Sequence, residues 1–258
     1  MTATAKREST EMSAAEMSVA EWQARCDLAA LYRIVDHFGW TDIIHTHMSA
    51  RVPGEHGTFL INHYEEMFHE ITASSLIKMD LEGNVLGRQG RFNAAGFTIH
   101  SGVYKARLDA NCVMHTHTRA GAGVSLIRNG LRPISQDALV VLDEVAYHEF
   151  GIPASQEECD ELGVSCQKGS CLVLLNHGLL THAPTIPGAL QRLYMLERAC
   201  ELELISRTLG EPPVQIEQRV IDAFAGHMKA ERAKPGFGRH EWNALLRVID
   251  NKGTDYRR

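Results

Sequence analysis

Two short apolar runs that each end in histidine constrain this chain more than any other feature. The first, "NCVMHTH", ends at His115 and His117, and the second, "CLVLLNHG", contains His177. Residues i and i+2 of a β-strand face the same side, so His115 and His117 can direct both imidazoles at one ion. If the two runs are neighbouring strands, His177 joins them. The sequence therefore predicts a metal site of His115, His117 and His177, because a catalytic metal commonly has three protein ligands and one open position.

The tripeptide His-Thr-His occurs twice, and its first copy, His45 to His47, is the weaker candidate. Fourteen histidines among 258 residues give about 0.75 His-x-His tripeptides by chance. Spacing alone therefore identifies neither pair. The first copy stands between a predicted helix and a polar strand, and no later histidine has a comparable strand-end setting. Ligation by His45 and His47 stays open as an alternative, as does a purely structural role for the other three histidines.

Hydrophobic periodicity predicts strands followed by mixed elements and then helices. The expected strands span 42–52, 58–63, 75–87 (two strands around a turn at 82–84), 111–117, 133–142 and 171–178. The expected helices span 18–39, starting at the capping-box spacing Ser18-x-x-Glu21, then 97–108, a start near 119, 187–210, 214–230 and 240–250. This order predicts an α/β sandwich with a mostly antiparallel sheet.

Composition excludes several classes of function. The net charge of −6 provides no basic field for nucleic acid or an anionic membrane, which favours a small polar substrate. The chain has no run of 18 apolar residues and no apolar leader at its start, so we expect a cytoplasmic protein. The six cysteines form no Cys-x-x-Cys pair and are expected to be reduced. Residues 1–17 lack periodicity and are predicted to be a disordered tail before a single domain at 18–258.

Between about Trp22 and Gly210 the chain contains, in this order, the blocks "ARVP", "FLIN", "HEITASSLIKMDLEGNVL", "AGFTIHSGVYKARLDANCVMHTHTRAGAGVS", "ISQDAL", "EVAYHEFG" and "LNHGLL". On these blocks the chain resembles the class II aldolase/adducin family, and most closely its adducin-like bacterial branch. It implies a three-layer α/β/α sandwich around a mostly antiparallel sheet. It also implies a divalent metal on His115, His117 and His177, and a homotetramer with active sites at subunit interfaces.

The chain departs from the sugar-phosphate aldolases of that family at three substrate elements. Their Ser-Ser-Glu is Ala94-Ala95-Gly96 here, their Gly-Asn-x-Ser is 46–49, and their Thr-Pro-Ser-Gly loop is 62–65, with the sequence Asn-His-Tyr-Glu. A phosphate dianion would lose hydroxyl and amide donors at all three, so an unphosphorylated substrate is expected. The resemblance places substrate binding at His47, Ser49 and Gly96. In particular, His47 can bind a carboxylate or phenolate.

Glycine at position 96 also limits the reaction, because forward aldol addition requires a base that removes a proton next to a carbonyl. Cleavage that releases CO2 or an aldehyde needs mainly an electron sink, which a metal ion can supply as a Lewis acid. The resulting carbanion must then gain a proton. The candidate catalytic donors are His100, Tyr147 and His148, and Glu149 is a further candidate.

The sequence thus predicts a metal-dependent lyase, an aldolase or a decarboxylase. Its expected substrate is a small unphosphorylated hydroxy- or oxo-carboxylate, aromatic ones included. Zinc is the favoured metal, and manganese, iron and cobalt also suit imidazole ligands. Two alternatives stay open: a non-catalytic interaction module like the adducin heads, and an iron-dependent oxygenase on the same scaffold.

Overall fold

A computed structural model describes residues 17–87, 89–152 and 154–258, and these form one sheet of eight strands. The predicted tail at 1–17 lies outside the described residues except for Met17. The strand order is β4-β3-β2-β1-β5-β8-β7-β6, and all pairs are antiparallel except β6 with β7. The strands are β1 (His47–Arg51), β2 (Thr58–Ile61), β3 (Ile77–Asp80), β4 (Val85–Leu86), β5 (Cys112–Thr116), β6 (Val145–His148), β7 (Cys171–Leu174) and β8 (Gly178–Ala183).

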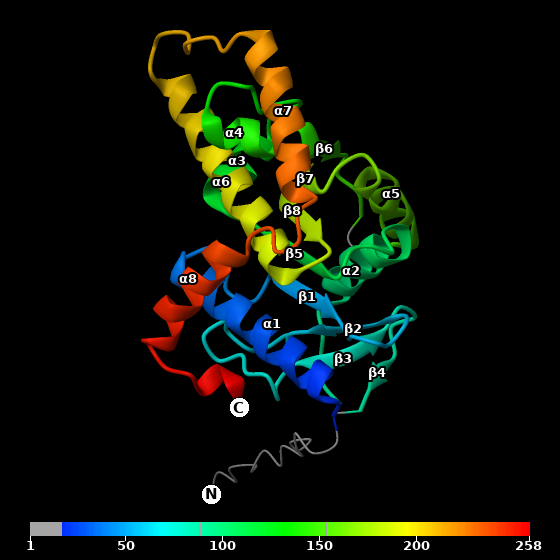
Figure 1. The fold of residues 1–258 in the computed structure, drawn as a ribbon. Coiled ribbons are helices and arrows are strands. Elements are labelled where there is room, and N and C mark those ends of the chain that lie inside the picture. Colours follow the sequence, from blue (N-terminus) through cyan, green and yellow to red (C-terminus); the bar gives the residue numbers. More distant parts are fainter. Residues whose placement is uncertain (1–16, 88, 153) are drawn as a thin grey trace, which may run out of the picture.

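Helices cover both faces of this sheet (Figure 1). One face carries α1 (Val19–His37), α3 (Arg119–Ser125), α4 (Gln136–Val141), α6 (Ile186–Thr208) and α8 (Arg239–Asp250), and α7 (Gln218–Arg232) packs against α4. The other face carries α2 (Ala94–Ala106) and α5 (Gln156–Cys166). Two short 3-10 helices span Leu142–Glu144 and Asp255–Arg257. The predicted three-layer sandwich is confirmed, and no helix of the described residues is long and apolar enough to cross a membrane.

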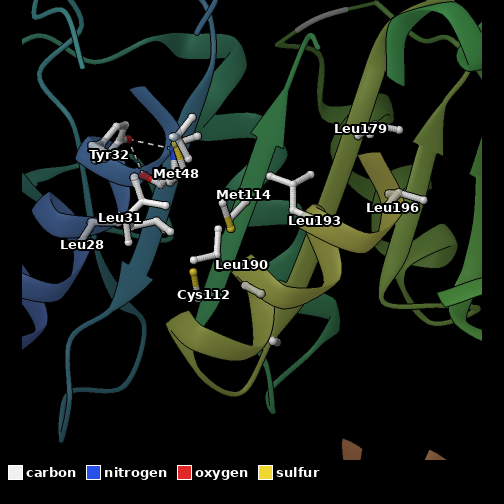
Figure 2. Close-up of a cluster of buried hydrophobic side chains, with 14 of the residues drawn as sticks. Leu28, Leu31, Tyr32, Met48, Cys112, Met114, Leu179, Leu190, Leu193 and Leu196 are labelled. Atoms are coloured by element: carbon white, nitrogen blue, oxygen red, sulfur yellow. Dashed lines mark hydrogen bonds between the residues drawn. The ribbon is translucent and has the colours of Figure 1, made fainter. Parts of the chain in front are cut away.

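Alternation along the strands assigns side chains to the two faces. In β5, Cys112 and Met114 belong to the core under α1 and α6, whereas Val113 belongs to the core under α2 and α5. Figure 2 shows Leu190 and Leu193 of α6 lying against this strand. Full burial of one such leucine contributes about 1.5–3 kcal/mol to folding. By the same alternation, His115 points to the α2 face, which is where the polar site lies.

The first helix begins where its capping spacing indicates. Ser18 Oγ accepts a hydrogen bond from the backbone N–H of Glu21 at 3.0 Å. The Glu21 carboxylate does not complete the capping box, because it pairs with Arg25 and Lys78 instead. The helix ends at His37, and Gly39 follows in the left-handed region with φ +68°. Glycine adopts that conformation without steric cost.

The predicted strand at 133–142 is wrong. Ser135 caps α4 through the backbone N–H of Ala138, and the buried Ala138 and Val141 face the core under α6. The strand begins only at Val145, as β6. Short apolar runs do not distinguish a buried helical turn from a buried strand. Helix α5 and strand β8 were not predicted either.

Candidate metal centre

Three imidazoles meet at one end of β5. His115 lies in the strand, His117 follows its last residue, and His177 lies in the turn between β7 and β8. Their ring centroids are 4.7 to 4.8 Å apart in all three pairs, and one ligand atom from each lies within 4.8 Å of the others. The structure thus brings together the three residues that the sequence singled out for a metal.

The strands that carry these histidines are arranged differently from the expectation that the two apolar runs are neighbouring strands. Strands β5 and β7 are not neighbours, because β8 lies between them and pairs with both. His177 reaches the site because a tight turn joins β7 to β8, with Asn176 in the left-handed region at φ 60°. A Cβ on Gly178 would overlap the carbonyl oxygen of Thr116 and would lie 3.1 Å from Cδ2 of His117. Glycine at this position therefore permits the close approach of the turn to β5.

Hydrogen bonds fix the orientation of two of the rings. His115 Nδ1 donates to the carbonyl oxygen of Leu179 at 2.9 Å, and His117 Nδ1 donates to Oδ2 of Asp42 at 2.8 Å. Each neutral ring therefore presents the lone pair of Nε2, and these two Nε2 atoms lie 2.9 Å apart. A backbone carbonyl or carboxylate that accepts from the distal nitrogen is the usual support of a metal-bound histidine. The donor set and its supports fit a divalent cation that prefers imidazole nitrogen.

The electrostatics keep His115 and His177 in the neutral form that binds metals. Burial lowers the pKa of His115 well below its usual value, and the nearby rings of His47, His177 and His117 add to that effect. Burial also lowers the pKa of His177 to about 4, with smaller contributions from His117 and His148. A low pKa means that a cation competes with few protons for these nitrogens at neutral pH.

A cavity of about 260 Å³ opens beside the three rings. That volume suits a small molecule. Six of the residues predicted for the site line it: His47, His115, His117, His148, Glu149 and His177. The predicted residues Ser49, Gly96, His100 and Tyr147 are not among its lining residues. His45, from the first His-Thr-His, lines the cavity as well, but it does not belong to the three-residue cluster.

His47 and His100 form one buried hydrogen-bonded chain with Ser49 and Tyr104. His47 Nδ1 lies 2.7 Å from Nε2 of His100, and Ser49 Oγ lies 2.5 Å from His100 Nδ1 and 2.8 Å from the Tyr104 hydroxyl. Burial lowers the pKa of His100 to about 3, lowers that of His47 and raises that of Tyr104, so all three are neutral. His100 is therefore placed to hold His47 and does not itself reach the cavity.

The hydrogen bonds among these four side chains all donate in the same direction. Ser49 is the only hydrogen-bonding partner of the Tyr104 hydroxyl among the described residues, and the buried tyrosine proton has an acceptor only when Tyr104 donates to Ser49. Ser49 then donates to His100 Nδ1, and the neutral His100 ring donates from Nε2 to His47 Nδ1. The proton of neutral His47 consequently lies on its Nε2. His47 thus offers an N–H donor to the cavity that it lines.

Tyr147 and His148 are neighbours in β6 and point to opposite faces of the sheet. Tyr147 packs against the core under α6, and its hydroxyl accepts a hydrogen bond from the backbone N–H of Leu131. His148 faces α5, where its ring contacts Ser165 and Glu158. The period of two in a strand excludes Tyr147 from the cavity that His148 lines.

Two acidic residues of the site were not predicted from the sequence. Asp42, which orients His117, lies in a loop without regular structure, and no motif marks it. Glu158 belongs to α5, a helix that was not predicted. Its signal was the Ser155-x-x-Glu158 spacing of a capping box, and Ser155 does accept from the backbone N–H of Glu158.

Comparisons with known proteins agree with this fold. Residues 26–204 match the family described as "Class II Aldolase and Adducin N-terminal domain". The crystal structure of an aldolase II superfamily protein from Pseudomonas syringae is 40% identical, with a TM-score of 0.88 over 95% of this chain and 98% of that one. L-fuculose 1-phosphate aldolase from Glaciozyma antarctica PI12 is 26% identical, with a TM-score of 0.79 over 92% and 93%. Alpha-adducin of Rattus norvegicus is 39% identical over 89% of this chain but only 33% of its own length.

Proposed function

Since the chain belongs to the class II aldolase and adducin family, we propose that it is a divalent-metal-dependent lyase. The proposed reaction cleaves a carbon–carbon bond in a small unphosphorylated hydroxy- or oxo-carboxylate, by decarboxylation or by retro-aldol cleavage. The observation that carries this proposal is the convergence of His115, His117 and His177 at the edge of one small cavity. We propose that the protein acts as a homotetramer.

The three histidines are the proposed holders of the cation, with zinc favoured and manganese, iron and cobalt also compatible with imidazole. A divalent cation at this place supplies a Lewis acid that draws electrons from a substrate carbonyl. Asp42 and the carbonyl of Leu179 keep the imidazoles of His117 and His115 in the ligating tautomer. The donor set is complete within a single chain.

His47 is the proposed anchor of the substrate. His47 lines the cavity, and a carboxylate or phenolate oxygen accepts a hydrogen bond from an imidazole N–H. His100, Ser49 and Tyr104 hold the imidazole in this tautomer from behind. These buried partners give the donor one fixed direction, which favours an anionic oxygen at one position of the substrate.

Glycine at position 96 leaves the proposed reaction without an acid–base group at that place. In the aldolases that the chain resembles, a glutamate at this position removes a proton from carbon. Gly96 has no group for that purpose, and it lies against the ring of His47. Bond cleavage creates the carbanion without that step.

A screen for release of CO2 and of aldehyde tests the proposal. Protein reconstituted with zinc, manganese, iron or cobalt is incubated with hydroxylated and oxo acids, and a His117→Ala variant serves as the matched control. We expect release of CO2 or aldehyde from at least one acid by the parent and none by the variant. Equal release by both proteins, or none with any metal and acid, would contradict the proposal.

The likeness to alpha-adducin supports a second candidate, a non-catalytic interaction module. Retention of all three histidines favours the enzyme, because an interaction surface does not need a cluster of three converging imidazoles. A purified protein that binds no metal and cleaves no acid would favour the module. Oxygen consumption by the iron-loaded protein would favour the iron-dependent oxygenase instead.

A further inference from the structure

One carboxylate that borders the cavity has an oxygen without a hydrogen-bonding partner among the described residues. Glu158 lies in the first turn of α5 and lines the cavity together with the three imidazoles. Its Oε1 accepts a hydrogen bond from Nε2 of His148 at 3.2 Å. Its Oε2 is buried and has no hydrogen-bonding partner among the described residues. A buried carboxylate oxygen without a partner is costly and calls for an explanation.

Two residues of α5, Ser165 and Glu158, hydrogen-bond to the two ring nitrogens of His148. A carboxylate only accepts, so the proton between the two side chains lies on Nε2 of His148. In the neutral ring Nδ1 is then an acceptor, and it receives the hydroxyl of Ser165 at 3.0 Å. The side chains of His148 and Glu158 are only 4% and 11% exposed. Ser165 and Glu158 therefore fix the imidazole, and the imidazole fixes one oxygen of the carboxylate.

Gly151 determines where the other oxygen lies. A Cβ at position 151 would overlap Oε2 of Glu158, so the backbone at this position packs directly against that oxygen. Gly151 lines the same cavity. Any larger residue would push the carboxylate away from its present place. Oε2 thus packs against a glycine backbone, and the Glu158 side chain borders the chamber that contains the candidate metal ligands.

We infer that Glu158 is the acid–base residue of this site and that His148 is its positioning residue. The inference rests on the proposed lyase function and supplies the carboxylate that position 96 lacks. In retro-aldol cleavage, Oε2 takes the proton of the substrate β-hydroxyl while its C–O bond becomes a carbonyl and the carbon–carbon bond breaks. The electron pair of that bond remains on the fragment that carries the carboxylate. Protonated Glu158 then returns its proton to that carbon and is again a carboxylate.

Exchange of carbon-bound hydrogen with solvent tests this role without the natural substrate. The probe is hydroxypyruvate in D2O with zinc-loaded protein, and the readout is deuterium incorporation at its C3 by NMR. We expect Glu158→Gln to lose about 100-fold or more of the exchange rate, because acid–base catalysis contributes about 10²–10⁴-fold. The control is Glu157→Gln, which alters an exposed carboxylate in the same helical turn and should keep the parent rate.

Metal content, measured on the same samples, separates the two hypotheses. Glu158→Gln with full metal content and a lost exchange rate supports the inference. Exchange at the parent rate in Glu158→Gln overturns it, as does a metal-loaded parent that exchanges no hydrogen, although metal binding then still stands. A parent that binds no metal overturns the proposed function and this inference together.

Two substitutions of His148 test its positioning role. Glutamine at 148 retains an N–H that can donate to Oε1 of Glu158, whereas leucine retains only the bulk. We expect His148→Gln to recover most of the exchange rate that His148→Leu loses, with equal metal content in both. Equal exchange rates in the two variants would show that the hydrogen bond to Glu158 has no part in the reaction.

Discussion

A Cβ at position 96 would lie 2.8 Å from Cδ2 of His47 and 3.0 Å from its Nε2. Two departures from the sugar-phosphate aldolases, glycine at 96 and histidine at 47, thus adjoin each other in space. A side chain at 96 and the present position of the His47 ring exclude each other. The two substitutions are therefore best understood as one change of the substrate pocket.

Gly96→Ala should destabilise the protein by about 1–2 kcal/mol, because the overlap with the His47 ring outweighs the better helix propensity of alanine. The control is Gly226→Ala in α7, where a Cβ meets nothing within 4 Å and should stabilise by about 0.5–1 kcal/mol. Urea unfolding measures both. Stabilisation of the same size in the two variants would show that position 96 has free space.

Phosphorylated sugars should be poor substrates. Among the described residues, no lysine or arginine lines the cavity, whereas Asp42, Glu149 and Glu158 do. A phosphate dianion would meet negative charge and few donors there, so its binding would be unfavourable. We expect little or no cleavage of L-fuculose 1-phosphate by the metal-loaded protein in an aldehyde-release assay. Efficient cleavage would show that other groups bind the phosphate.

Asp42 should matter for metal affinity although it is not a proposed ligand. Asp42→Ala removes the acceptor of His117 Nδ1–H, and loss of such a partner typically weakens metal binding by about 10–100-fold. Competition with a zinc chelator measures the affinity. Asp36→Ala, which alters an exposed aspartate at the end of α1, should leave it unchanged. Unchanged affinity in Asp42→Ala would remove the supporting role of this carboxylate.

His182, in β8, should make the protein less stable in mild acid. Burial, followed by repulsion from Arg107, lowers its pKa from 6.5 to about 4. Above pH 6.5 neither the folded nor the unfolded chain binds the proton. Between pH 6.5 and about 4 only the unfolded chain binds it, so the free energy of unfolding falls by up to about 1.4 kcal/mol per pH unit. Below about pH 4 both states are protonated and the loss is complete.

His182→Gln removes this titration and retains a donor for the carbonyl of Gly169. Urea unfolding of the metal-free proteins at pH 7 and pH 5 provides the comparison. The parent should lose about 2 kcal/mol more than the variant between these values. The other histidines are common to both proteins and cancel in the difference. An equal loss in parent and variant would contradict the assignment.

The three-layer fold could be predicted from the sequence, and so could the convergence of the three histidines. His115 and His117 follow a strongly apolar run, and His177 follows another, so a strand-end setting could be predicted from local pattern. Which strand lies beside which could not be predicted. Strand β8 separates β5 from β7, and its pairing depends on the whole sheet.

The remainder of the site depends on tertiary contacts that no local pattern encodes. Asp42 is 75 residues from the histidine that it orients. Tyr147 and His148 are adjacent in a strand, so only one of their side chains can face the cavity. Which of the two does so becomes clear only when the orientation of β6 in the sheet is known. His100 was predicted to be a catalytic proton donor. In the structure it is buried behind His47 and hydrogen-bonds to that ring instead.

The metal content of His117→Ala, measured beside that of His45→Ala, tests the three-histidine centre most directly. Both histidines line the cavity, but only His117 belongs to the cluster of His115, His117 and His177. The proteins are reconstituted with zinc, and loosely bound metal is removed. Elemental mass spectrometry should then find about one zinc per chain in the parent and in His45→Ala, and almost none in folded His117→Ala. Equal zinc content in His117→Ala and the parent would contradict the three-histidine centre.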